Sequence, residues 1–315
     1  MHRFIAPYWL LSTCLCLAPL VAEEDPHAIR FENVKTSRWR FGVEISARGG
    51  AVSGIVATLP VPMDWPEQKV KLLNESISPR SAKVSFRVLE EGVKQMVVTI
   101  PKLADGEEAS IVFTYEIEKA WIEAPTSTAE LRAPKNARSL SKFLTASPYI
   151  ETNDAAIRRQ ASELVNSELE AWKQTEAFFT WVRANIKYKF AEEIKPAPDA
   201  LRDREGDCEE LSSLFIAFCR NQKIPARAVW IPGHTYPEFY LEDQSGHGHW
   251  YPCQAAGEAP DFGRMPEDRP ILQKGDNFKL PDDKKPQRYV KQSLTARNAV
   301  AAPQVKFIMA PVVEK

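Results

Sequence analysis

The sequence has almost no net charge, which narrows the partners it can bind. Its 41 Lys and Arg residues nearly balance 42 Asp and Glu residues, for a formal net charge of −1. Without a basic excess, we expect no electrostatic attraction to nucleic acid or to an anionic membrane surface. Hydrophobic residues make up 44% of the 315 residues, which allows sizeable buried cores in one large domain or two ordinary ones.

Long apolar runs are also scarce, and the one that is present lies at the N-terminus. A positive start at Arg3 precedes a largely apolar stretch over 8–21, and acidic residues follow from Glu23. This pattern predicts a secretory signal peptide over residues 1–22, because the run is too short and wrongly flanked for a spanning helix. An uncleaved anchor is the alternative. We therefore expect an exported protein, periplasmic or secreted, with no stable membrane span after signal removal.

Cysteine is rare, and two of the five cysteines lie within the predicted signal peptide. The three that remain are Cys208, Cys219 and Cys253. An odd number predicts at least one free thiol or an intermolecular bridge, and Cys219 and Cys253 can also pair with each other. The sequence has no Cys-x-x-Cys pair, so a zinc site formed by these cysteines with His247 and His249 is not favoured. We predict no cofactor and no metal.

Residues 30–120 alternate between apolar and polar positions, as the strands of an antiparallel sheet do. Four apolar runs have this period of two, around Trp39, Val84, Val98 and Phe113, and turn signals separate them. The pattern predicts an antiparallel β-sandwich that serves for binding or packing. We find no cluster of reactive residue types in this part of the sequence.

A Pro-rich segment over 121–150 predicts a linker, after which the pattern becomes helical. Asp154 is a favourable cap for a helix with apolar positions from Ile157 onward, and Phe178 and Trp181 lie on a second helical run. We assign residues 151–315 to a domain in which helices pack on an antiparallel sheet, and we expect the C-terminal strands to belong to it. The predicted fold class is therefore α+β.

The strongest chemical signal is the sequence Gly206-Asp207-Cys208. Asp207 is a favourable N-cap and Glu210 can complete a capping box, which places Cys208 in the first turn of an apolar helix. Free backbone N–H groups and the helix dipole favour a thiolate there, but the neighbouring carboxylates oppose it, so a base is still needed. His234, at the start of a predicted strand, is the candidate base.

Three motifs follow one another between residues 150 and 255. A Gly-Asp-Cys sequence ends at Cys208, an Ile-Pro-Ala-Arg turn begins at Ile224, and a His-x-Tyr-x-Glu-x-Tyr strand begins at His234. Together they resemble the core of transglutaminase-like domains, which have Trp where this strand has Tyr236. The resemblance implies a papain-like cysteine fold in which Cys208 attacks an amide carbonyl and His234 accepts and returns the proton. The thioacyl intermediate, formed on a protein or peptide substrate, then passes to water or to an amine.

The third catalytic position departs from the family pattern. The family has Asp in a Trp-x-Pro-x-Asp sequence, where this chain has Trp-Tyr-Pro-Cys-Gln ending at Gln254. The resemblance therefore places Gln254 beside His234, where its amide oxygen can orient the imidazole but stabilises an imidazolium less than a carboxylate does. Asp261 is a second candidate for this role. A catalytically silent protein that binds peptide or glycan is the alternative function.

Overall fold

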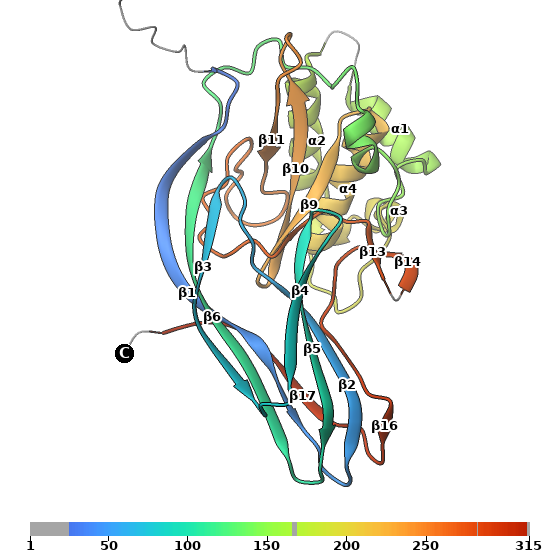
Figure 1. Ribbon diagram of the computed structural model, residues 1–315. Coiled ribbons are helices and arrows are strands. Elements are labelled where there is room, and N and C mark those ends of the chain that lie inside the picture. The colour runs from blue at the N-terminus through green and yellow to red at the C-terminus, as the bar shows by residue number, and fades with distance from the viewer. Residues whose placement is uncertain (1–24, 166–168, 282, 314–315) are drawn as a thin grey trace, which may run out of the picture.

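The computed structural model describes residues 25–165, 169–281 and 283–313, which form an elongated β-sandwich with a helical lobe at one end (Figure 1). The fold is α+β with mostly antiparallel strands, which confirms the predicted class. The predicted signal peptide, residues 1–22, lies outside the described residues. Within the described ranges, no helix is both long enough and apolar enough to cross a membrane.

The first sheet of the sandwich has four strands in the order β17-β1-β6-β3. Their bounds, in that order, are Gln304–Pro311, Arg30–Ser46, Glu108–Glu123 and Gln68–Ser78. Alternate side chains of β1 and β6 point into the core, where the buried rings of Phe41, Phe113 and Tyr115 contact one another. The two-residue period read from the sequence therefore corresponds to one buried face of each strand.

The second sheet joins the sandwich to the helical lobe. It runs in the order β11-β10-β9-β12-β5-β2-β15, with β4 paired to β5 and β16 paired to β2. The bounds are Gly248–Pro252 (β11), His234–Glu242 (β10), Ala226–Ile231 (β9), Gln273–Lys274 (β12), Val93–Leu103 (β5), Val52–Val61 (β2), Ser293–Thr295 (β15), Lys83–Leu89 (β4) and Asn298–Ala299 (β16). Because β12 pairs with both β9 and β5, the sheet continues from the sandwich into the strands beneath the helices.

The C-terminal strands differ from the sequence-based assignment, which placed them in the catalytic domain. In the structure β15 and β16 pair with β2, and β17 pairs with β1 from Trp39 opposite Pro311 to Ser46 opposite Gln304. Phe307 packs against the sandwich core. The physical reason is that β17 covers an edge of β1 whose backbone N–H and C=O groups would otherwise lack partners.

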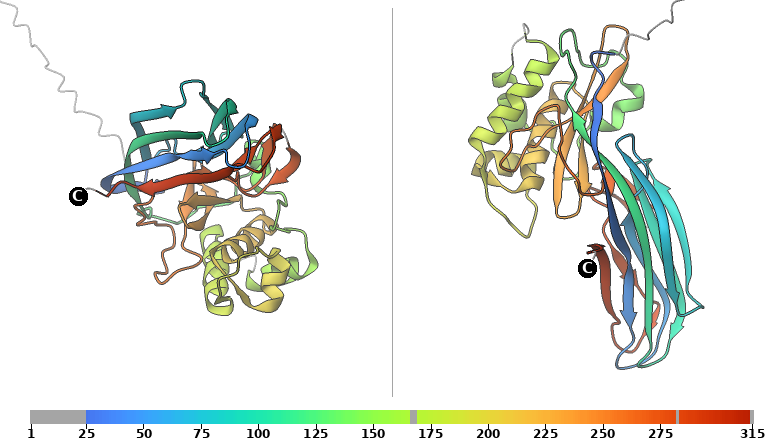
Figure 2. Two further views of the ribbon diagram at one scale, coloured as in Figure 1. Left: turned by 90° about the horizontal axis from the view of Figure 1, so that it is seen from below. Right: turned by 90° about the vertical axis from the view of Figure 1, so that its left-hand side faces the viewer.

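Four α-helices among the described residues form the lobe on one side of the sheet (Figure 2). They are α1 (Ala155–Leu164), α2 (Ala171–Asn185), α3 (Ala197–Asp203) and α4 (Cys208–Asn221). The short elements are η1 (Arg138–Phe143), β7 (Lys187–Tyr188), β8 (Glu205–Gly206), β13 (Phe278–Leu280) and β14 (Asp283–Gln287). Helix α4 packs directly on β9 and β10, and the other three helices pack on α4. Asp154 caps α1 as predicted, by accepting hydrogen bonds from the N–H groups of Ala156 and Ile157.

Candidate active site

The helix cap places Cys208 at the first position of α4. Asp207 Oδ1 accepts the N–H of Glu209 at 2.8 Å, and Glu210 Oε2 accepts the N–H of Asp207 at 2.8 Å, which completes the predicted capping box. A Cβ atom at Gly206 would lie only 2.5 Å from the Glu210 Cβ. The absence of a side chain at Gly206 therefore lets Glu210 reach back over the cap and fix the start of the helix.

The thiol of Cys208 lies, partly buried, where the head of α4 meets the start of β10. The backbone of Thr235 lies close enough to the thiol to lower its pKa, against the larger effect of burial. One turn further along the helix, Ser212 Oγ donates to Thr235 O at 3.4 Å. Thr235 follows His234 directly, so these contacts place the head of α4 against the start of the strand that carries His234.

The surroundings of Cys208 oppose a preformed thiolate. Burial and the charges of Asp207 and Glu209 raise the pKa of the Cys208 thiol to about 11, so they outweigh the helix dipole. Burial, together with the Glu210 carboxylate, also raises the pKa of Asp207 to about 6. At neutral pH the resting sulfur is therefore a thiol, and the carboxylate next to it changes charge in the physiological range.

The imidazole of His234 is held by Gln254. Nε2 of His234 lies 2.8 Å from Oε1 of Gln254, so the structure brings together two of the three predicted site residues. An amide oxygen can only accept a hydrogen bond, so Nε2 carries the proton and Nδ1 of a neutral ring is free to act as a base. Burial lowers the pKa of His234, and the charge of Arg269 acts in the same direction.

The main chain of Gln254 is fixed from two sides. Its N–H donates to the backbone oxygen of Asp261 at 2.8 Å, and Nη1 of Arg183, on α2, donates to its carbonyl oxygen at 2.7 Å. The carboxylate of Asp261, the second candidate for orienting the histidine, pairs instead with Arg264 at 3.0 Å. Asp261 therefore supports Gln254 through its backbone and does not take its place at the imidazole.

The structure adds a charged pair that the sequence-based reasoning missed. Arg269 donates from Nε and Nη2 to the Glu267 carboxylate at 2.9 and 2.7 Å, and from Nη1 to Pro232 O at 3.1 Å. The guanidinium charge interacts with both Cys208 and His234. These residues belong to no recognisable motif, and only the path of the loop after β11 brings them to the site.

Glu238, the acidic residue of the strand that begins at His234, lies in a buried cluster of ion pairs. Its carboxylate pairs with Arg227 at 2.7 Å and with Lys274 at 2.7 Å, and Lys274 also binds Glu67 at 2.6 Å. Burial would raise the pKa of Glu238, but the two cations outweigh it and lower the pKa to about 2. Because Glu67 lies in the turn between β2 and β3, this cluster connects the sandwich to the helical lobe.

The three cysteines that the structure describes are all free thiols. Cys219 and Cys253 are completely buried, and burial raises the pKa of each thiol well above its ordinary value. Cys208 is the one of the three with partial exposure. The pairing of Cys219 with Cys253, which the sequence left open, is therefore not formed.

The fold is papain-like. The helix α4 begins with a cysteine and packs on an antiparallel sheet, His234 begins the strand β10, and its partner Gln254 follows the neighbouring strand β11. Residues 158–255 match the transglutaminase-like superfamily, and this segment is a domain of that superfamily. The sequence resemblance that carried the prediction is thereby confirmed for this segment.

Solved structures extend the likeness beyond that segment. A candidate cysteine protease from Cytophaga hutchinsonii is similar at a TM-score of 0.60 and 16% identity, over 91% of this chain and 94% of that chain. The periplasmic domain of TgpA from Pseudomonas aeruginosa matches at 12% identity and a TM-score of 0.37, over 74% of this chain and 73% of that chain. No curated protein matches the sequence. The first likeness shows a shared fold that includes the sandwich.

Proposed function

We propose that this chain is an exported cysteine enzyme that acts on amide bonds through a thioacyl intermediate at Cys208. The observation that carries the proposal is the position of Cys208 at the head of α4, which packs on the strand that begins at His234, while His234 itself is paired with Gln254. The N-terminal pattern over residues 1–22 supports export. The substrate is a protein or a peptide.

The resting state sets the order of the chemical steps. The thiol is protonated and the imidazole is neutral, because burial raises the pKa of Cys208 and lowers the pKa of His234. Nδ1 of His234 takes the thiol proton as the sulfur bonds to the amide carbonyl carbon. The imidazolium then gives this proton to the leaving amine as the C–N bond breaks. Water or an amine, deprotonated by His234, attacks the thioester and releases the thiol.

Charge that develops on the carbonyl oxygen needs hydrogen-bond donors. The carboxylates of the cap take the N–H groups of Asp207, Glu209 and Glu210, and they leave the N–H of Cys208 for the oxyanion. Arg269 places a positive charge near both reacting groups, which favours a transient thiolate. Glu267 and Pro232 hold this guanidinium in position.

Two exposed aromatic rings indicate where a peptide would lie. Strand β7 pairs with β8 so that Tyr188 is opposite Gly206, two residues before Cys208. Tyr188 is 56% exposed and Phe190 is 72% exposed. Burial and then the charge of Cys208 raise the pKa of Tyr188, as expected for a ring near the thiol. Such rings offer apolar surface to a substrate side chain.

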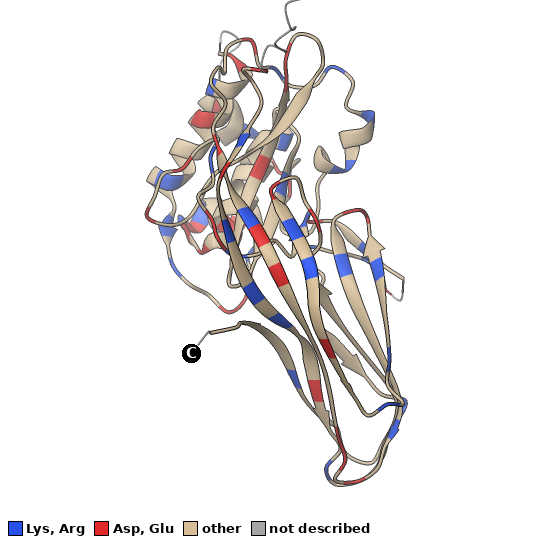
Figure 3. Ribbon diagram, turned by 60° about the vertical axis from the view of Figure 1, so that its left-hand side comes forward, with Lys and Arg blue, Asp and Glu red and all other residues tan. Residues whose placement is uncertain are grey.

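The surface charges are mixed, with both signs along the strands in Figure 3, and favour no substrate of one charge.

The test is alkylation of the native protein with iodoacetamide from pH 5 to 9, with each modified cysteine located by mass spectrometry. We expect Cys208 to react while Cys219 and Cys253 stay protected, so the two buried thiols report on any unfolding. His234→Ala should slow Cys208 at pH 7 by at least about tenfold, since a positioned base contributes roughly a hundredfold or more to proton transfer. Equal rates in the wild type and the variant would contradict the proposal.

A catalytically silent peptide-binding protein is the second candidate, and the pKa of Cys208 at about 11 is the observation that favours it. The same alkylation series separates the two functions. If the labelling rate of Cys208 rises with pH only as an ordinary thiol ionises, and His234→Ala does not change it, the site binds peptide without catalysing a reaction. If it depends on His234, incubation with peptide amides, with and without an added amine, separates hydrolysis from transfer.

A further inference from the structure

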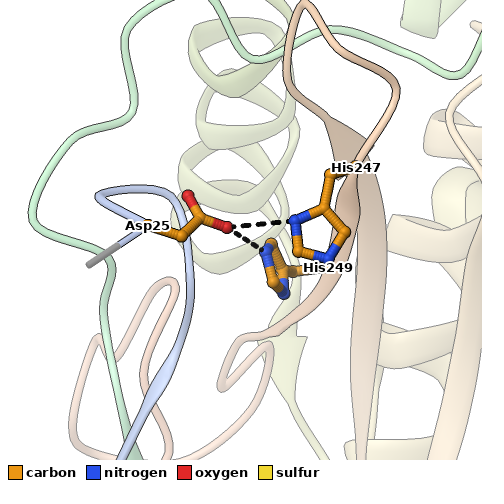
Figure 4. Close-up of side chains that lie close together, drawn as sticks. All are labelled: Asp25, His247 and His249. Carbon is orange, nitrogen blue, oxygen red and sulfur yellow. Dashed lines mark hydrogen bonds and ion pairs between the residues drawn. The ribbon is translucent and has the colours of Figure 1, made fainter. Parts of the chain in front are cut away.

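Three side chains with metal-ligating atoms meet beside the turn between β10 and β11 (Figure 4). Oδ2 of Asp25 lies 3.2 Å from Nδ1 of His247 and 2.9 Å from Nε2 of His249. All three atoms lie within 4.8 Å of one another. Asp25 and His249 are 224 positions apart in the sequence, so only the fold brings them together.

Strand β11 and the segment around Asp25 both hold the three side chains in place. His247 and His249 flank Gly248, and residues two apart along an extended chain face the same side. Oδ1 of Asp25 accepts the N–H of His27 at 2.9 Å, which leaves Oδ2 directed at the two rings. The hydroxyl of Tyr251 donates to His27 O at 2.7 Å and holds the segment against β11. The carboxylate is thus oriented by its own outer partners, as in metal sites.

The three ligand atoms can hold one cation after a small adjustment. Ligand atoms about 2.0–2.2 Å from a tetrahedral zinc ion lie roughly 3.3–3.6 Å apart, so the Asp25 oxygen, now at hydrogen-bond distances of 3.2 and 2.9 Å from the two rings, moves slightly outward when an ion enters. Without an ion, this single oxygen accepts from both imidazoles when each ring is protonated at the facing nitrogen. The side chain of His247 is 66% exposed, so an ion has a path from solvent and water can complete its coordination.

We propose that Asp25, His247 and His249 form a binding site for a divalent transition-metal ion of the zinc type. Two imidazoles and one carboxylate suit zinc and its first-row neighbours, whereas calcium and magnesium prefer oxygen ligands alone. The ion links the N-terminal segment to β11, the strand that ends two residues before Gln254. Because the three ligands lie outside the Cys208 centre, the site is independent of the proposed reaction.

The test is calorimetric titration of tag-free, EDTA-treated protein with Zn²⁺, together with thermal unfolding. We expect one ion per chain and a midpoint that rises by roughly 5 °C at a hundredfold excess over the dissociation constant. His247→Ala, His249→Ala and Asp25→Asn should each weaken binding by at least about tenfold, since even outer partners of metal ligands contribute that much. The matched control is Asp105→Asn, which makes the same change as Asp25→Asn at an exposed turn of the sandwich and should leave binding unchanged.

Zinc can also bind a catalytic thiol, so Cys208→Ser is titrated in parallel. Retention of one ion by Cys208→Ser, with loss in His249→Ala, supports the proposed site whatever the outcome of the alkylation experiment. Ca²⁺ should cause no thermal shift. The inference is overturned if the wild type takes up no zinc at millimolar concentration, or if the ion is lost in Cys208→Ser and kept in the ligand variants.

Discussion

Replacing Gln254 with glutamate tests whether this residue sets the strength of His234 as the proposed base. Gln254→Glu keeps the side-chain length and places a carboxylate oxygen where Oε1 now lies 2.8 Å from Nε2 of His234. A carboxylate favours the imidazolium, which an amide oxygen can orient but not neutralise. The substitution should therefore raise the pKa of His234, which burial and Arg269 now lower.

The expected magnitude follows from the geometry of the pair. An opposite charge at this range shifts a pKa by about 1–3 units, and each unit corresponds to about 1.36 kcal/mol. The population of the thiolate–imidazolium pair grows with the ratio of the two ionisation constants, so each unit multiplies it about tenfold. Because the pKa of Cys208 is about 11, the thiolate–imidazolium population is small in the wild type and can increase without saturating. Alkylation of Cys208 at pH 7 should increase by about tenfold or more.

The assay is the rate of iodoacetamide labelling at Cys208 against pH in five proteins: the wild type, Gln254→Glu, Gln304→Glu, His234→Ala and the double variant of His234→Ala with Gln254→Glu. Gln304→Glu makes the same charge change on an exposed residue of β17 and should leave the rate unchanged. In a His234→Ala background, Gln254→Glu should have no accelerating effect, because the coupling passes through the imidazole. A rate in Gln254→Glu that stays within about threefold of the wild type, or a gain that survives without His234, would refute the role assigned to Gln254.

Two further substitutions test the charges around the site. Asp207→Asn keeps a good N-cap and removes a charge that raises the pKa of Cys208. Labelling should quicken at pH 8 but match the wild type near pH 5, because the pKa of Asp207 is about 6 and protonation removes the same charge. Lys274→Met leaves the buried carboxylates of Glu67 and Glu238 without a shared cation, and should cost about 3–5 kcal/mol in urea unfolding at pH 7.

Each of these predictions has an internal control. Asp105→Asn, on an exposed turn of the sandwich, changes charge far from Cys208 and should not affect labelling. Lys306→Met breaks an ion pair with Glu44 whose side chains are 74% and 45% exposed, and should change stability little. The loss in Lys274→Met should shrink as pH falls, because the repulsion between the two carboxylates that Lys274 now separates is relieved when one of them takes up a proton. A loss that is equal at pH 4 and pH 7 contradicts that explanation.

The local structure of the site was largely predictable, because it rests on short-range rules. An Asp and a Glu three positions apart specify the cap that starts α4, and both hydrogen bonds of the capping box form. C-terminal strands were expected from the sequence, but a strand-forming segment does not encode which strand edge is open for it to pair with. The edge of β1 is created by the fold as a whole, so the pairing of β17 with β1 had no signal within 286–315.

Site residues that lie far from the motifs in the sequence could not be predicted in the same way. Arg269 reaches the site through the loop after β11, and no spacing rule connects it with Cys208. The two histidines around Gly248 were weighed as zinc ligands together with the cysteines, and that combination was not favoured. In the structure they face Asp25, which no sequence pattern joins to them. A charged or ligating group supplied by a distant segment becomes visible only when the fold is known.

Two buried ion pairs at the end of β12 explain why the helical lobe and the sandwich form one unit. Arg220 at the end of α4 binds Asp276 at 2.9 and 2.8 Å, and Glu238 on β10 binds Lys274 at 2.7 Å. Lys274 and Asp276 flank one glycine at the end of β12, so two buried ion pairs hold this strand between β9 and β5.

The ion pairs of Lys274 also decide how far the helical lobe depends on the sandwich. Lys274 completes its pairing with Glu67, which the sandwich supplies, and β12 bridges to the sandwich strand β5. A helical lobe without the sandwich would keep Lys274 beside Glu238 but lose Glu67 and the β5 partner of β12. Since an uncompensated buried charge is costly, the strands that carry His234 owe their position in part to residues of the sandwich. The sandwich is therefore part of the frame of the site as well as a separate layer of strands.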